Sequence, residues 1–362
     1  MRRFPSLPSL HHQPSPSLLP FNSISLSLSQ IFPKFGFDFS IARAAAPRSV
    51  TGRLMEAEIP LVRRRRASVR LCNVKSCPTE LLEIPAEDPS IVVLFIPGNP
   101  GIVGFYRDFI EEMYEQLNGS ASVTAVGHIC HSRKSWMQGR MWTLEDQINH
   151  KVDFIKQELH NATIPIVLVG HSIGSYICLE VLKRFPQQVK FNIGLYPFLT
   201  LNNDSVKQSI IEKITASPFF SAAISSSAAL LGLFPKWASS SLVKSSVGKS
   251  WSSTAVDATC NDLLQYHTVR NALYMAMTEF KKLSEDPDWM FIRGKRDRIA
   301  FLFGIDDHWG PLSLFEKIST RIPEISLSIE REGHTHAFCC TNAGSVWVAS
   351  HVVRLIKHRM SS

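Results

Sequence analysis

A short motif near the middle of the chain has the residue types of an activated nucleophile. The stretch GHSIG at residues 170–174 matches G-x-S-x-G, a pattern in which a serine stands on a sharp turn between a strand and a helix. An apolar run at 164–169 precedes it, and a helical pattern through residue 185 follows it. The helix N-terminus favours negative charge that develops beside the serine. The sequence therefore predicts that Ser172 is a nucleophile, and the alternative is a serine that caps a tight loop.

A serine hydroxyl is a weak nucleophile near neutral pH and needs a histidine base, which a carboxylate orients. Where this motif is used, the acid follows a late strand and the histidine follows the last one. Asp306 and Asp307 follow a strand predicted at 299–305, and His334 and His336 follow one predicted at 325–329. Asp297 is a weaker candidate because it precedes its strand. The residues by themselves leave both pairs of candidates open.

Acyl transfer by a serine also needs two backbone N–H groups to stabilise the oxyanion. One is expected from Ile173, directly after the nucleophile. The other is expected from the loop PGNPG at residues 97–101, after the first predicted core strand. Its glycines let the backbone approach a substrate closely, and its prolines remove N–H groups and stiffen the loop. We favour the Asn99 N–H as the second donor, with an ordinary Pro-Gly turn as the alternative.

The elements that must position these residues follow from the apolar pattern. Short runs rich in β-branched residues predict buried strands at 91–96, 123–126, 164–169, 189–195, 299–305 and 325–329. Helical spacing predicts helices at 104–117, 143–159 and roughly 345–356. Strands that alternate with helices predict an α/β domain with a mostly parallel central sheet. The alternation stops between 198 and 290, which predicts a core at 56–197 and 291–362 and a largely helical cap at 198–290.

One segment of the predicted cap is unusually apolar. Residues 218–237 read PFFSAAISSSAALLGLFPKW, contain no acidic residue and approach the length that crosses a bilayer. Four serines and a proline near each end argue against a membrane span. The segment is then either a buried cap helix or a membrane-surface segment flanked by Lys213, Lys236 and Lys244.

Composition limits the classes of function. The chain has 362 residues, of which 44% are hydrophobic and 19% charged, with a net charge of +8. Its basic residues are not interleaved with aromatic residues, so we expect no nucleic-acid partner. The seven cysteines are scattered without metal-ligand spacing, which predicts reduced thiols, no disulfide framework and no metal site. The chemistry expected of Ser172 needs no organic cofactor either, and nothing in the sequence indicates an oligomeric state.

The first 55 residues are rich in serine, proline and leucine and carry no acidic residue before Asp38. Such a segment does not build a core. It resembles an organelle transit peptide, which makes a plastid location an alternative, or it precedes a true start at Met55.

Four segments together carry a family resemblance. FIPGNPG at 95–101, GHSIGSY at 170–176, DHWGP at 307–311 and HAF at 336–338 resemble the lipid droplet-associated hydrolase family of α/β-hydrolases. The match extends over about residues 90–361, and the long N-terminal extension departs from the family pattern. The resemblance implies an α/β-hydrolase fold with Ser172 as nucleophile, Asp307 as acid and His336 as base.

The resemblance also implies a function. It indicates a serine ester hydrolase that acts on lipid esters, either sterol esters or acylglycerols, at the surface of lipid droplets or the endoplasmic reticulum. The apolar segment at 218–237 suits attachment to such a surface. The competing hypothesis is a droplet-surface binding or scaffolding protein with marginal hydrolase activity, because a fold does not fix a function.

Overall fold

The structure is a computed structural model that describes residues 65–361 except 136, 138, 160–163 and 248–249. The predicted transit-like extension at 1–55 and the alternative start at Met55 lie outside the described residues.

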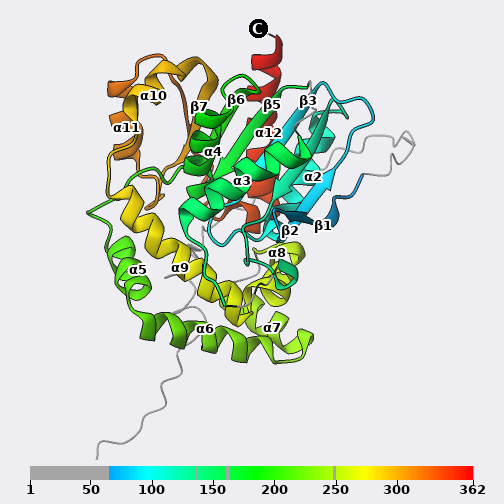
Figure 1. Ribbon diagram of the computed structural model, residues 1–362, viewed down its shortest axis with the longest axis vertical. Coiled ribbons are helices and arrows are strands. Elements are labelled where there is room, and N and C mark those ends of the chain that lie inside the picture. The colour runs from blue at the N-terminus through cyan, green and yellow to red at the C-terminus, as the bar shows by residue number, and fades with distance from the viewer. Residues whose placement is uncertain (1–64, 136, 138, 160–163, 248–249, 362) are drawn as a thin grey trace, which may run out of the picture.

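An eight-stranded sheet forms the centre of the described chain, with the strand order β1-β2-β4-β3-β5-β6-β7-β8 (Figure 1). The strands from β4 to β8 in this order pair in parallel, and β1 and β2 pair antiparallel at one edge. The mostly parallel sheet predicted from the sequence is therefore confirmed. The strands are β1 (Ser68–Val74), β2 (Cys77–Ile84), β3 (Ile91–Ile96), β4 (Ala121–Val126), β5 (Ile166–His171), β6 (Val189–Leu195), β7 (Ile299–Gly304) and β8 (Ser326–Glu330).

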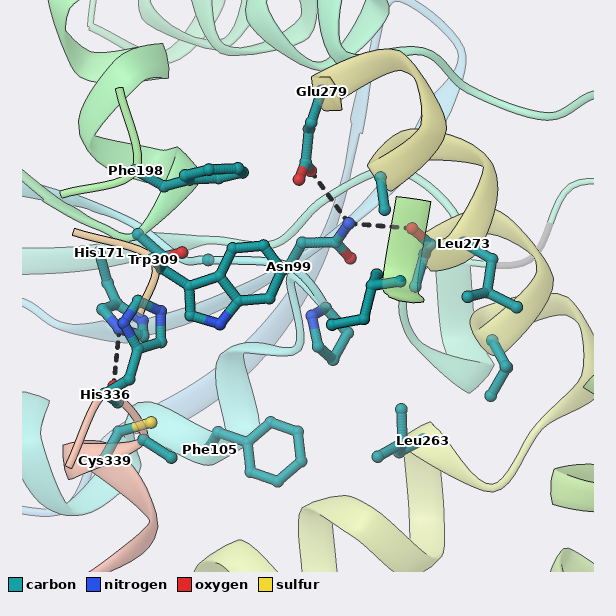
Figure 2. Close-up of a pocket in the computed structure, with 18 of the residues that line it drawn as sticks. Asn99, Phe105, His171, Phe198, Leu263, Leu273, Glu279, Trp309, His336 and Cys339 are labelled. Carbon is teal, nitrogen blue, oxygen red and sulfur yellow. Dashed lines mark hydrogen bonds between the residues drawn. The ribbon is translucent and has the colours of Figure 1, made fainter. Parts of the chain in front are cut away.

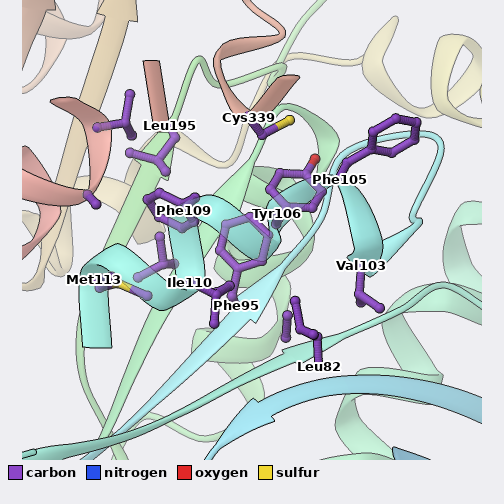
Figure 3. Close-up of a cluster of buried hydrophobic side chains, with 14 of the residues drawn as sticks. Leu82, Phe95, Val103, Phe105, Tyr106, Phe109, Ile110, Met113, Leu195 and Cys339 are labelled. Carbon is purple, nitrogen blue, oxygen red and sulfur yellow. The ribbon is translucent and has the colours of Figure 1, made fainter. Parts of the chain in front are cut away.

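Helices cover both faces of the sheet because its central strands are apolar on both sides. One face packs against α2 (Arg107–Gln116) and α12 (Asn342–Ser361). In that layer the ring of Phe95 lies 4.6 Å from the ring of Tyr106 and 5.3 Å from that of Phe109, centre to centre (Figure 3). The other face packs against α3 (Leu144–Glu158), α4 (Ile173–Arg184) and α11 (Leu312–Arg321).

Three elements of the core, two strands and a helix, were not predicted. The hairpin of β1 and β2 lies at the edge of the sheet, where Arg70 pairs with Glu83 across the strands. Its first strand is largely exposed and so lacks the continuous apolar run that marks a central strand. Helix α11 was also missed, and β5 starts at Ile166 rather than at residue 164.

Between β6 and β7 the chain is almost wholly helical. Helices α5 to α9 lie together beyond one end of the sheet, with α6 and α7 farthest from it (Figure 1). The elements here are α5 (Val206–Ala216), α6 (Pro218–Gly232), α7 (Lys236–Val247), α8 (Ser253–Ala258), the π-helix η4 (Thr259–Leu263), α9 (Tyr266–Leu283) and α10 (Trp289–Gly294). Short 3-10 turns complete the chain: η2 (Val103–Tyr106), η3 (Arg133–Ser135), η5 (Arg296–Arg298) and η6 (Phe338–Cys340).

The apolar segment at 218–237 is not one helix. It breaks after Gly232, whose Cα lies so close to the Leu264 carbonyl that a Cβ would approach its oxygen to 2.1 Å. Helix α6 is also only partly buried, so the prediction of a buried cap helix holds for one of its faces alone. No single helix of the described chain is long and apolar enough to cross a membrane; α5 and α6 meet that test together, but they are bent by 95°.

Candidate active site

Ser172 occupies a strained turn between β5 and α4. Its backbone has φ 55° and ψ −124°, a conformation that L-residues adopt rarely and that often marks functional sites. The flanking glycines make the turn possible. A Cβ on Gly170 would lie 2.4 Å from the Gly174 oxygen, and one on Gly174 would lie 2.3 Å from the Ile96 oxygen. The hydroxyl thus stands at the start of α4, as the sequence motif predicts.

Asp307 and His336 form a buried pair. His336 Nδ1 lies 2.9 Å from Asp307 Oδ2, and the Trp309 N–H donates to Asp307 Oδ1 at 2.9 Å. Their side chains are 1% and 7% exposed, so the hydrogen bond is shielded from water. The alternative acids lie elsewhere: Asp306 is exposed, and Asp297 forms an ion pair with Arg359.

The loop before His336 is held at two points. Glu330, buried at the end of β8, accepts hydrogen bonds from the N–H groups of Glu332 and His334, at 2.5 and 3.0 Å. The His336 carbonyl accepts a hydrogen bond from His171 Nε2 at 2.9 Å. The His334 side chain instead faces Trp347, with ring centres 6.0 Å apart. The structure therefore brings His336, and not His334, to Asp307.

Ser172 and His336 line one cavity between the sheet and the helical cap (Figure 2). The space within it, open mouth included, is about 1150 Å³. Most of the surface is apolar and comes from α5, α6, η4 and α9, with Phe105, Phe198 and Trp309 from the core side. A cavity of this composition suits an apolar ligand that places a reactive group beside the serine.

The loop at 97–101 passes directly beside the serine. A Cβ on Gly98 would lie 3.1 Å from Ser172 Cβ. The Gly98 N–H donates to the Tyr106 hydroxyl at 3.0 Å, and the Gly101 N–H donates to His131 Nδ1 at 2.9 Å. Since both prolines of the loop lack an N–H, the Asn99 N–H is the loop's remaining donor beside Ser172.

A hydrogen-bonded chain that the sequence reasoning missed links this loop to the histidine loop. His171 Nε2 must donate to the His336 carbonyl, so its Nδ1 accepts from the Tyr106 hydroxyl at 2.8 Å. That hydroxyl in turn accepts from Gly98. Burial lowers the pKa of His171 well below its ordinary value, which matches the neutral ring that this chain needs. Tyr106 and His171 thus link three segments: the loop at 97–101, the turn at Ser172 and the loop that carries His336.

A second buried polar cluster supports the same loop from behind. His131 accepts from Gly101, and the Gly101 carbonyl accepts the His128 N–H at 3.0 Å. The fully buried Lys151 donates to the Gly127 carbonyl at 2.8 Å and lies 3.0 Å from His150 Nδ1. Burial lowers the pKa values of all three histidines and of Lys151. The three histidines therefore pack behind the loop as neutral rings.

These groups predict a strong acid sensitivity. Apart from His351, four buried histidines have lowered pKa values, to about 3 for one of them, so on unfolding below pH 6.5 each takes up a proton that the folded protein excludes. The free energy of unfolding then falls by about 1.4 kcal/mol per histidine and pH unit. Three carboxyl groups whose pKa values burial raises act in the opposite direction: Glu279, with a pKa of about 8, Glu80 and Asp262. The four histidines are His128, His131, His150 and His171.

We therefore expect the Tm to fall steeply from pH 7 to pH 5 and to recover on return to pH 7. The Tm at each pH is measured by thermal unfolding, with circular dichroism as the signal. Replacing the exposed His358 with Asn is the control, and should leave the slope unchanged. A Tm that stays flat between pH 7 and pH 5 contradicts the prediction.

Two further cavity residues were also missed. Tyr106 lies eight residues after Gly98, and Glu279 lies on α9, far along the chain from the motifs. In the sequence, Glu279 shows only as an acidic residue next to Phe280 on a helix that also carries Leu273 and Ala276. A carboxylate at the edge of an apolar stripe is an ordinary boundary position.

Comparison with known proteins identifies the family. Residues 89–339 match the family described as lipid-droplet associated hydrolase. A lipid droplet-associated hydrolase of Gallus gallus is 29% identical over 264 residues, which cover 69% of this chain and 80% of the relative. One of Dictyostelium discoideum is 27% identical over 276 residues, which cover 72% and 86%. The family predicted from the sequence motifs is confirmed.

Solved structures support the fold independently. A haloalkane dehalogenase of Agrobacterium tumefaciens aligns with a TM-score of 0.62 at 12% identity, over 81% of this chain and 97% of the dehalogenase. At that identity the likeness concerns the fold, which carries many different reactions. The match over most of the chain, together with this architecture, shows that the protein belongs to the lipid droplet-associated hydrolase family and has the α/β-hydrolase fold.

Proposed function

We propose that this protein is a serine ester hydrolase that acts on lipid esters, sterol esters or acylglycerols, at the surface of a lipid droplet or of the endoplasmic reticulum. The observation that carries the proposal is the buried Asp307–His336 pair, which shares with Ser172 a largely apolar cavity under the cap. The family supports a hydrolase, and the cavity supports an apolar substrate.

The proposed reaction has two halves. Ser172 Oγ attacks the acyl carbonyl while His336 accepts the hydroxyl proton, and Asp307 stabilises the resulting imidazolium. The N–H groups of Asn99 and Ile173 stabilise the oxyanion. Collapse of the intermediate returns the proton to the leaving alcohol and leaves an acyl-serine. Water, deprotonated by His336, then attacks the acyl-serine, and its proton is passed back to Ser172 as the fatty acid leaves.

The cap supports a membrane-surface location. Helix α6, the turn after it and the start of α7 expose apolar side chains that do not line the cavity, here called the α6–α7 face. Exposed apolar surface of this kind marks an interaction site, and an interfacial helix inserts such a face among lipid headgroups. Such a face is more stable against a lipid surface than in contact with water. It also lies on the part of the cap that encloses the cavity. The face consists of Phe219, Phe220, Leu230, Leu233, Phe234 and Trp237.

The same face is the observation that favours the second candidate, a droplet-surface binding or scaffolding protein with marginal hydrolase activity. None of its side chains belongs to the Ser172 site, so binding to lipid does not require catalysis.

A fluorophosphonate probe tests the proposed function because it reacts with a serine only when that serine is activated. We expect wild type to be labelled stoichiometrically and the Ser172→Ala variant to remain unlabelled. The matched control is Ser175→Ala, which removes a buried hydroxyl that donates to the Gly170 carbonyl one turn into α4. Labelling of Ser172→Ala at the wild-type level would show that another residue reacts and would contradict the assignment.

A further inference from the structure

One polar pair interrupts the apolar cap side of the cavity. Glu279 extends from α9 toward Asn99, which belongs to the loop beside Ser172 (Figure 2). Asn99 Nδ2 donates to Glu279 Oε1 at 2.9 Å and to the Ala272 carbonyl at 2.9 Å. Glu279 is only 4% exposed, and among the described residues that line the cavity it is the acidic one. A charged-type residue is rarely buried in this way without a partner.

The pair still has hydrogen-bonding capacity. Asn99 Oδ1 is buried and has no hydrogen-bond partner among the described residues. Burial raises the pKa of Glu279 to about 8, so near pH 7 most of the carboxyl groups carry a proton and can donate. An unsatisfied buried acceptor is unfavourable, and a bound ligand removes that cost if it supplies a donor.

A hydroxyl group matches this pair because it donates and accepts at once. It can donate to Asn99 Oδ1 and accept from the protonated Glu279. A second ester or a hydrocarbon ring at the same place supplies no donor and leaves the acceptor unpaired.

The pair also lies at a defined place relative to the reaction. Asn99 directly follows Gly98, where a Cβ would be 3.1 Å from Ser172 Cβ, and consecutive Cα atoms are about 3.8 Å apart. The Asn99 side chain is therefore within a few bonds' reach of a carbonyl attacked by Ser172. In an acylglycerol with a free hydroxyl, that hydroxyl is two carbons away from the ester oxygen.

We propose that Asn99 and Glu279 form a subsite for a substrate hydroxyl group, and that the preferred lipid esters are acylglycerols with a free hydroxyl rather than triacylglycerols or sterol esters. This inference rests on the proposed ester hydrolase function and names the substrate class of that same site. A site built to bind a hydroxyl discriminates strongly against analogues that lack it, since its buried polar groups then stay unpaired.

The test compares two esters that differ only in hydroxyl groups, 1-monodecanoylglycerol and propyl decanoate, in the same detergent. We expect kcat/KM of the wild-type protein to be at least about tenfold higher for the glycerol ester. In Glu279→Leu the ratio of the two kcat/KM values should fall about tenfold. In Glu279→Gln, which keeps a donor and an acceptor, it should stay within about threefold of wild type. Glu285→Leu, which removes an exposed carboxylate near the end of the same helix, should leave the ratio unchanged.

The outcomes separate the subsite from the function on which it rests. A wild type without preference for the glycerol ester overturns the subsite, as does an equal fall for both esters in Glu279→Leu, which indicates only a structural role. If wild type hydrolyses neither ester faster than Ser172→Ala, the proposed function fails as well. Hydrolysis of both esters with an unchanged ratio in Glu279→Leu leaves the hydrolase proposal intact and overturns the subsite alone.

Discussion

Replacing Ser172 with alanine is expected to lower kcat for a soluble ester such as p-nitrophenyl octanoate by about 10⁴-fold or more. The variant removes the hydroxyl oxygen that, in the proposed mechanism, forms the acyl-enzyme. We expect the fold to survive, because the change removes one hydroxyl and alanine faces the same backbone conformation, with a φ of 55°, as serine does. The measurement is the steady-state rate, with circular dichroism and Tm as checks on folding.

Asp307→Asn is the companion variant and should lower kcat by about 10⁴-fold, because an amide no longer holds the His336 tautomer or stabilises its cation. Combining it with Ser172→Ala should cause little further loss, since residues of one catalytic unit are not additive. Asp306→Asn is the matched control: its carboxylate is adjacent in sequence but exposed, and we expect a rate within about twofold of wild type. Equal losses for Asp306→Asn and Asp307→Asn would argue against the assigned acid.

The second large effect is expected on lipid binding. Phe219, Leu233 and Trp237 of the α6–α7 face are 75%, 81% and 78% exposed. Changing all three to serine removes about 1.5 kcal/mol of apolar transfer energy each, or about 4 kcal/mol together. Partition onto a lipid surface should then fall about a thousandfold. Flotation with artificial droplets of triolein coated by phosphatidylcholine measures this partition.

Two comparisons make that experiment decisive. Met290→Ser removes a side chain that is 87% exposed on α10, away from the α6–α7 face, and should leave flotation unchanged. Ser172→Ala should float like wild type, because the face and the nucleophile are separate. Equal flotation of wild type and the triple variant would contradict a lipid-docking role for the face. If catalysis were absent while flotation persisted, the scaffolding candidate would be favoured.

The family motifs show how far local sequence reasoning extends. The strand, turn and helix around Ser172 depend on neighbours within a few residues, namely a β-branched run and two glycines, so the pattern alone predicts the nucleophile. The mostly parallel sheet likewise follows from strands that alternate with helices, whereas the strand order comes from the structure alone. The edge hairpin of β1 and β2 was missed because its first strand is largely exposed and lacks the continuous apolar run that marks a buried strand.

Local sequence reasoning does not decide which residue of each pair of catalytic candidates is used. Asp306 and Asp307 follow the same strand, and so do His334 and His336, so periodicity cannot separate them. The resemblance to a family pointed to Asp307 and His336, and in the structure these two lie 2.9 Å apart. Contacts distant in sequence orient them: Glu330 holds the histidine loop, and His171 binds the His336 carbonyl across 165 residues.

The sequence by itself indicated the α/β-hydrolase core and the family, and it predicted a nucleophilic serine and an apolar cap, because each is expressed in local spacing and residue type. Only the tertiary structure decided which side chains meet. Three contacts join segments that are far apart in the sequence: the approach of Gly232 to the Leu264 carbonyl, the hydrogen bond between Tyr106 and His171, and the pair of Asn99 and Glu279. Such contacts depend on how helices pack over the sheet, and that packing leaves no periodic mark on either partner.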